Sequence, residues 1–279
     1  MLRALLLFLI QVSLIVVVAR FLLYKPAKGI AHRLRLNERA SGQILGYLTS
    51  APEFVTTIFV ALNGFMAAVA YNILSSNVIN VFLAFMAAAV YGKWRELLSR
   101  ALWREQLLIA ASIAVPIVVL ATGQVEAAWT IPAFLLGYVG YLLVIRKIST
   151  DSAVPFETDE IVHMQVDSRL STRWYITLNA GIIVVALGGL YFLGDALGTT
   201  VRELGTTFGV PEILLGVLIG VVTSLPELTT FFASYGWHRA QGSTRATEEV
   251  SHNLLASNAS NLLLVQTVGV LIFLLFAVG

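Results

Sequence analysis

Apolar runs of about 20 residues recur along the whole chain, with short polar segments between them. Runs of this length match the hydrocarbon core of a bilayer, so each predicts a membrane-spanning helix. The short alternating segments of a transmembrane barrel do not occur in the sequence. We therefore expect an all-α fold, a polytopic membrane protein with about eight transmembrane helices. The predicted spans are 4–23, 41–62, 65–91, 106–122, 127–145, 174–194, 210–234 and 250–278.

Composition agrees with this pattern. The chain has 279 residues, of which 58% are hydrophobic and only 12% charged, about half the charged share of an ordinary soluble domain. Polar connections are expected at 24–40, 92–105, 146–173 and 236–249. Residues 4–23 are interpreted as a span rather than a signal peptide, because no small-residue cleavage site follows. The chain has no cysteine, which excludes disulfides, thiolate metal sites and a cysteine nucleophile. No nucleic-acid signature stands out, so the lipid bilayer is the expected surrounding.

Two polar blocks interrupt the apolar runs, and both occur twice. Residues 49–53 read Thr-Ser-Ala-Pro-Glu and residues 223–227 read Thr-Ser-Leu-Pro-Glu. A block of the form Asn-x-x-x-Ser-Asn-x-x-Asn follows each copy, at 72–80 and 253–261. The chain is therefore expected to consist of a first repeat half (1–145, spans 1–5), a cytoplasmic linker (146–173) and a second repeat half (174–279, spans 6–8).

The positive charges predict how the spans are oriented. If the N-terminus lies outside, the inward segments hold 16 of the 18 Lys and Arg residues, and the outward segments hold only Arg3 and Arg202. The positive-inside rule thus favours eight spans with both termini outside. In this topology the two copies of the blocks run in opposite directions. Inverted repeats of this kind are typical of secondary transporters with a site near the bilayer midplane.

The blocks contain the residues that a cation needs. Pro52 and Pro226 have no N–H group, so each breaks its helix and frees a carbonyl about one turn earlier. Glu53 and Glu227 lie near mid-span, where a carboxylate costs at least ~2.5–3.5 kcal/mol on insertion scales, and the four spans with blocks contain no Lys or Arg. Two acids without a base imply bound cations or protons. Carboxylate, hydroxyl, amide and carbonyl oxygens suit Ca²⁺ and other hard cations.

At these residues the sequence resembles the cation/calcium antiporter superfamily, in particular membrane domains of the sodium/calcium exchanger type. The resemblance implies that Glu53 and Glu227 are the central ligands. It also implies that Ca²⁺ and Na⁺, or H⁺, are transported and that no cofactor is permanently bound. The further ligands that it implies are Thr49, Ser50, Ser76 and Asn80 in the first repeat, Thr223, Ser224, Ser257 and Asn261 in the second, and the backbone carbonyls of Gly46 and Gly220.

The chain departs from the family pattern in two respects that bear on function. The family often has aspartate where this chain has Asn80 and Asn261, so the site carries two acids and no third. The family usually has five spans per repeat, whereas the second half here has three. A homodimer contact or another subunit is a candidate for covering the surface that the missing helices would occupy.

The sequence thus favours a sodium/calcium antiporter in the plasma (cell inner) membrane, working by alternating access with spans 1 and 6 as the moving part. A proton/cation exchanger and a non-transporting subunit or ion sensor stay open as alternatives. An enzyme is not expected, because no acid–base–nucleophile set converges on the blocks. His252 is expected to be a packing or interfacial histidine, and the acidic residues 157–160 a solvated part of the linker.

Overall fold

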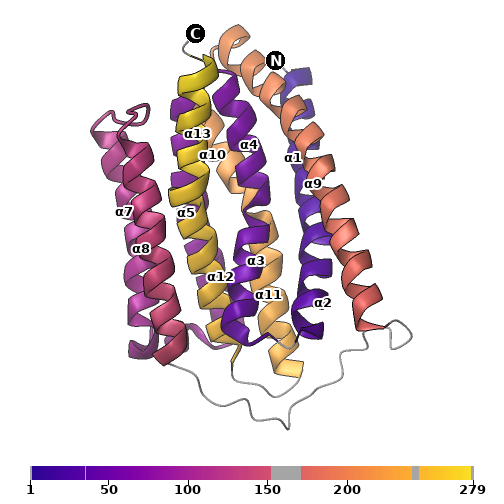
Figure 1. Ribbon diagram of the computed structural model, residues 1–279. Coiled ribbons are helices and arrows are strands. Elements are labelled where there is room, and N and C mark those ends of the chain that lie inside the picture. Colours follow the sequence, from indigo (N-terminus) through magenta and orange to yellow (C-terminus); the bar gives the residue numbers. More distant parts are fainter. Residues whose placement is uncertain (1, 35, 152–170, 241–244, 278–279) are drawn as a thin grey trace.

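The computed structural model describes residues 2–34, 36–151, 171–240 and 245–277, and within these ranges it contains helices and turns but no strand (Figure 1). Among the described residues, eight helical stretches are long and apolar enough to cross a membrane, which confirms the predicted fold class. They are Leu2–Ala31, Glu38–Leu62, Met66–Val90, Arg100–Ala121, Thr130–Lys147, Thr172–Thr207, Glu212–Arg239 and Ala246–Phe276.

The first and sixth spans are longer than predicted. The first runs through α1 (Leu2–Val18), η1 (Ala19–Tyr24) and α2 (Lys25–Arg33), and the sixth through α9 (Thr172–Arg202) and η3 (Glu203–Thr207). The expected ends at residues 23 and 194 were wrong, because packing of α2 against α9, and of α9 against α4, extends these helices past their apolar parts. The two spans lie side by side along one edge of the molecule (Figure 1).

The second and seventh spans are each broken at a serine, as the prolines predict. α3 (Glu38–Thr49) and α4 (Ala51–Leu62) meet at Ser50, and α10 (Glu212–Thr223) and α11 (Leu225–Ala240) meet at Ser224. Pro52 and Pro226 are the second residues of α4 and α11. An N–H group in the first turn of a helix has no acceptor within that helix, so proline is tolerated there. Both breaks therefore follow directly from the sequence.

The third and eighth spans carry the Asn/Ser blocks. The third is α5 (Met66–Val90), which follows a tight turn at Gly64 with a φ of 84°. The eighth comprises α12 (Ala246–Ser260), η4 (Asn261–Val265), α13 (Gln266–Ile272) and η5 (Phe273–Ala277). Because α11 extends to Ala240 and α12 begins at Ala246, the polar connection expected at 236–249 is mostly helix, and that boundary was wrong.

The remaining two spans flank the eighth. They contain α7 (Trp103–Ala121), reached through α6 (Trp94–Leu97) and η2 (Arg100–Leu102), and α8 (Thr130–Asp151). α7 packs against α5 and α12, while α8 packs against η4 and α13. Figure 1 shows this pair at the opposite edge from α1 and α9.

Glycines let the helices of one repeat approach those of the other. A Cβ atom added to Gly46 of α3 would lie 2.5 Å from the carbonyl oxygen of Asn253 in α12, and one added to Gly216 of α10 would lie 2.4 Å from that of Ala68 in α5. A Cβ on Gly220 of α10 would likewise lie 2.7 Å from the Asn72 carbonyl oxygen in α5. α3 therefore packs on α12, and α10 packs on α5. The first helix of each broken span thus contacts the helix that carries the Asn/Ser block of the other repeat.

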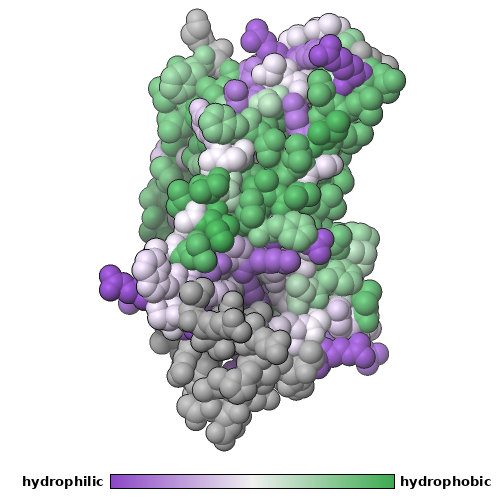
Figure 2. Space-filling view, turned by 90° about the vertical axis from the view of Figure 1, so that its right-hand side faces the viewer, coloured by the Kyte–Doolittle hydropathy of each residue, from purple (hydrophilic) through white to green (hydrophobic). Residues whose placement is uncertain are grey.

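The two repeats run in opposite directions, as expected for inverted repeats. In Figure 1 the chain passes upward from α3 to α4 and downward from α10 to α11, and both termini lie at the upper end. Figure 2 shows a broad hydrophobic band between hydrophilic residues near the two ends of the molecule. The linker, with its acidic residues 157–160, lies mostly outside the described residues, because 152–170 are not described. The division into two halves at this linker stays a prediction.

Candidate functional site

The two helix breaks bring the predicted polar residues together in the interior. Glu53 lies in the first turn of α4 and Glu227 in the first turn of α11, where the partial positive charge of a helix N-terminus stabilises a carboxylate. The polar side chains proposed from the sequence are all buried, none more than 2% exposed: Thr49, Ser50, Glu53, Ser76, Asn80, Thr223, Ser224, Glu227, Ser257 and Asn261.

The two buried carboxylates come from different repeats. They lie close enough to repel one another, and within the described part of the chain neither forms an ion pair. The hydroxyl of Thr223 lies beside Glu53 and that of Thr49 beside Glu227, so each glutamate has a threonine of the other repeat as its neighbour. Two close acids without a base favour a bound cation or proton between them.

A chain of hydrogen bonds links the two repeats at Ser257. Its hydroxyl donates to Glu227 Oε1 at 3.0 Å and lies 2.9 Å from Ser50 Oγ. Asn80 Nδ2 donates to the same Ser257 oxygen at 3.2 Å. Either hydroxyl can be the donor in the contact between Ser50 and Ser257. The counterpart serine, Ser76, contacts the Gly220 carbonyl at 3.4 Å.

Several buried oxygen atoms of this cluster accept no hydrogen bond from any described residue. A buried polar atom without a partner costs about 1–3 kcal/mol, so a group of them at one place calls for a ligand. Oxygen atoms are the ligands of Ca²⁺ and other hard cations. The atoms are Glu53 Oε1 and Oε2, Glu227 Oε2, Ser224 Oγ, Asn80 Oδ1 and Asn261 Oδ1.

The backbone carbonyls of Gly46 and Gly220, which the resemblance implies as ligands, already accept hydrogen bonds. Gly46 O accepts from Thr49 Oγ1 at 3.2 Å and from Ser50 Oγ at 3.0 Å. Gly220 O accepts from the Ser76 hydroxyl. A carbonyl oxygen has two lone pairs, and a role as ligands for Gly46 and Gly220 stays a prediction. No three His, Asp or Glu side chains cluster among the described residues, so the acidic part of the site is limited to its two glutamates.

Charged groups near the ends of the helices form contacts that the sequence did not reveal. Glu249 of α12 is buried, pairs with Lys28 of α2, and accepts hydrogen bonds from Ser234 at 3.0 Å and from His238 at 3.0 Å. This cluster joins the first span to the helices of the site. The only sequence signal was the high density of charge at these helix ends, which we interpreted as polar connections.

His252 is fully buried, so its predicted packing role fits the structure and the interfacial one does not. Its Nε2 atom lies 3.6 Å from Oε1 of Glu105, a buried residue of α7. The sequence interpretation had placed Glu105 in a polar connection. That placement was wrong, because α7 begins at Trp103 and the connection ends one turn earlier than expected.

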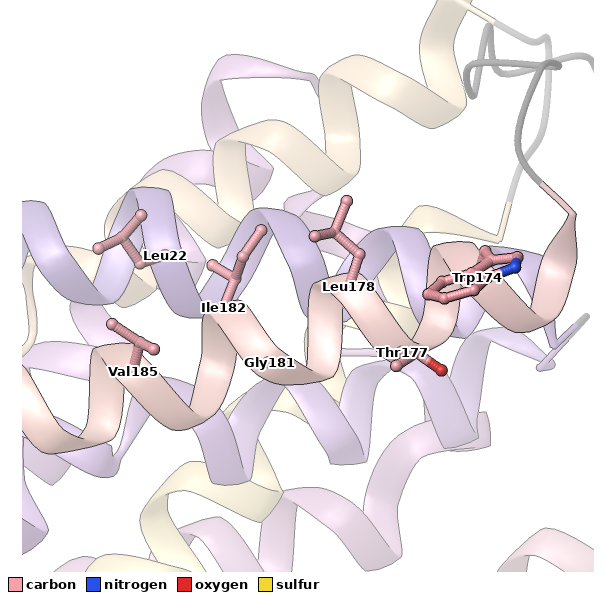
Figure 3. Close-up of a pocket in the computed structure, with 7 residues that line it drawn as sticks. All are labelled: Leu22, Trp174, Thr177, Leu178, Gly181, Ile182 and Val185. Carbon is pink, nitrogen blue, oxygen red and sulfur yellow. The ribbon is translucent and has the colours of Figure 1, made fainter.

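A surface groove of about 580 Å³ lies away from this site, along η1 and α9. Figure 3 shows Leu22, Leu178, Ile182 and Val185 along it, with the Thr177 hydroxyl and the Trp174 indole nitrogen as the polar atoms of the labelled side chains. Such an apolar lining suits lipid tails rather than a cation. The groove therefore does not compete with the buried oxygens as a cation site.

Eight membrane spans, two inverted broken helices and a buried site of oxygen atoms define the class: an integral membrane transporter for cations. The family model described as sodium/calcium exchanger protein matches residues 3–147 and 178–277, most of the chain. The chain belongs to this family, whose members are antiporters that transport calcium and other ions and are not a class of enzymes. Comparison with curated proteins and with solved structures gave no match.

Proposed function

We propose that this protein is a secondary active antiporter that exchanges sodium for calcium at the site between Glu53 and Glu227. The observation that carries the proposal is the pair of buried, mutually close carboxylates without a basic partner, surrounded by buried oxygens that accept no hydrogen bond within the described chain. One divalent cation neutralises both carboxylates. Two monovalent cations do the same, so the two kinds of ion exclude each other.

The packing of the first and sixth spans supports a mechanism of alternating access. α9 lies against α4, with Gly198 so close that an added Cβ would be 2.8 Å from Phe59 Cβ, and α1 contacts α10. Within the described part of the chain, these two long helices form no hydrogen bond with a side chain of the site. We propose that they move as a pair across the four site helices and open the site to one side at a time.

We propose that the protein lies in the plasma (cell inner) membrane with both termini outside, an orientation that the distribution of positive charges supports. The end of the molecule where α2 ends and α9 begins would then face the cytoplasm (Figure 1). We further propose that a homodimer or another subunit covers the side of the site helices that a five-span second repeat would occupy.

The test is uptake of ⁴⁵Ca²⁺ into proteoliposomes, driven by an outward sodium gradient. We expect Glu53→Gln and Glu227→Gln each to abolish uptake, because each removes one of the two charges that neutralise the ion. Glu126→Gln, at an exposed glutamate between α7 and α8, is the matched control and should leave uptake unchanged. Uptake at the wild-type level by either the Glu53 or the Glu227 variant would contradict the proposal.

Flux into the same vesicles, together with a binding measurement, separates sodium/calcium exchange from the alternative functions. The site has amides at Asn80 and Asn261 rather than a third acid, and two carboxylates are enough to exchange two protons for one divalent ion. Calcium flux driven by a pH gradient without sodium would therefore establish a proton/cation exchanger. Calorimetric Ca²⁺ binding without flux under sodium, potassium or proton gradients would instead indicate an ion sensor or a subunit of a larger complex.

A further inference from the structure

Asn77 and Asn258 are the central asparagines of the two Asn/Ser blocks, and both are fully buried. Each follows one of the expected ligands, Ser76 or Ser257. One residue turns a helix by about 100°, so the central asparagines do not share the helix face of those serines. Their amides instead form hydrogen bonds with the backbone of the other repeat.

The side chain of each central asparagine donates a hydrogen bond to the backbone of the other. Asn258 Nδ2 donates to the backbone carbonyl of Asn77 at 3.1 Å, and Asn77 Nδ2 donates to the backbone carbonyl of Asn258 at 3.3 Å. Asn77 Nδ2 also donates to the Ser112 carbonyl in α7 at 2.9 Å. A backbone carbonyl only accepts, so these bonds fix which end of each amide is nitrogen and which is oxygen.

The fixed side-chain oxygens then orient the amides of the site. Asn261 Nδ2 donates to Asn77 Oδ1 at 3.2 Å, and Asn80 Nδ2 donates to Asn258 Oδ1 at 3.2 Å. Each bond again crosses from one repeat to the other. Because the nitrogen of each site amide faces its central asparagine, its oxygen faces away, and both of these oxygens are among the buried atoms that accept no hydrogen bond from a described residue.

We propose that Asn77 and Asn258 are positioning residues, which turn the amide oxygens of Asn261 and Asn80 toward the transported cation. An amide that is not held in this way can rotate and present its N–H₂ group, whose positive end repels a cation. A carboxylate in the same place has an oxygen at either end and needs no such orientation. The proposal rests on the proposed function, because it takes the buried oxygens to be the cation site.

The first experiment measures Ca²⁺ binding to the purified full chain by calorimetry. We expect Asn77→Ala and Asn258→Ala each to weaken binding about 10- to 100-fold, the usual effect of losing a group that orients a metal ligand. The matched control is Asn179→Ala, an asparagine of α9 whose amide donates to the Tyr175 carbonyl of its own helix at 2.8 Å. Its Ca²⁺ affinity should equal that of the wild type.

The second experiment separates orientation from packing. In the pairs Asn77→Ala with Asn261→Asp, and Asn258→Ala with Asn80→Asp, the ligand no longer depends on orientation. The alanine substitution should then change affinity by no more than about twofold relative to the aspartate single variant, as for independent sites. An equal loss in the asparagine and aspartate backgrounds would show that the central asparagines only pack the helices, and would overturn the proposal.

The outcomes distinguish this proposal from the proposed function. If the wild type binds no Ca²⁺, both fail. If the wild type binds Ca²⁺ and both alanine variants bind it equally well, only the positioning role fails. If an alanine variant does not purify as a folded protein, Asn77→Ser and Asn258→Ser replace it in both experiments, since serine is too short to form both bonds of the asparagine.

Discussion

At the scale of single residues, the absence of a side chain matters as much as its presence. The proposed site requires that oxygen atoms from α3, α5, α10 and α12 lie within reach of one ion, so the helices must approach more closely than ordinary side chains allow. Gly42 and Gly216 provide this approach, since an added Cβ at either would lie 2.4 Å from a backbone oxygen, of Glu249 or Ala68. A backbone atom of a packed helix cannot move aside as the end of a flexible side chain does.

We therefore expect Gly216→Ala to lower the stability of the folded protein by about 1–3 kcal/mol, the usual cost of overpacking. Gly188→Ala is the control, because Gly188 also lies within a helix but has open space around its Cβ position. Alanine there should be neutral or stabilising by up to about 1 kcal/mol, since it reduces the entropy of the unfolded chain. Melting temperatures in the same detergent compare the two, and equal effects would contradict this account of the helix contact.

At the scale of helices, the sequence predicts best those features that depend on a few adjacent residues. The breaks at Ser50 and Ser224 are determined by the proline two residues later, and the close contacts of α3 and α10 by their glycines. The burial of Glu53 and Glu227 follows from their position within apolar runs. In these cases the local sequence pattern permits one arrangement of the chain, and the structure has that arrangement.

Features that depend on contacts between distant segments could not be predicted in this way. Lys28, Glu105 and Glu249 lie at the polar ends of their runs, where a charged side chain usually faces water. Only the packing of α2, α7 and α12 shows that they are shielded from it. The hydrogen bonds of Asn77 and Asn258 were equally out of reach, because they follow from how the two repeats cross.

The contact of α2 with α12 gives a prediction at this scale. Lys28→Met should destabilise the folded protein by about 3–5 kcal/mol, because it leaves the buried Glu249 carboxylate without its cation. Lys25→Met, at an exposed lysine one turn earlier, should have little effect. Adding Glu249→Gln to Lys28→Met should recover part of the loss in a thermal melt. Equal melting temperatures for the Lys28 and Lys25 variants would show that the ion pair does not stabilise this contact.

At the scale of the whole molecule, the same polypeptide carries two copies of one design in opposite orientations. The proposed ion site lies where the copies meet. Each glutamate has a threonine of the other copy beside it, and α12 packs on α3 while α5 packs on α10. The site thus has a nearly equivalent environment on its two sides, which suits a protein that opens to each face of a membrane in turn.

The orientation of the molecule can be measured directly, because the natural chain has no cysteine and any introduced one is the sole thiol. The positive-inside rule places the turn between α7 and α8 outside and the segment between α5 and α7 inside. We expect Glu126→Cys to react with a membrane-impermeant maleimide applied to intact cells, and Ser99→Cys to react only after the membrane is made permeable. The reverse labelling pattern would place both termini in the cytoplasm and would assign the basic ends of α2 and α9 to the outer face. It would leave the arrangement of the buried oxygen atoms unchanged, but each broken span would cross the membrane in the opposite direction.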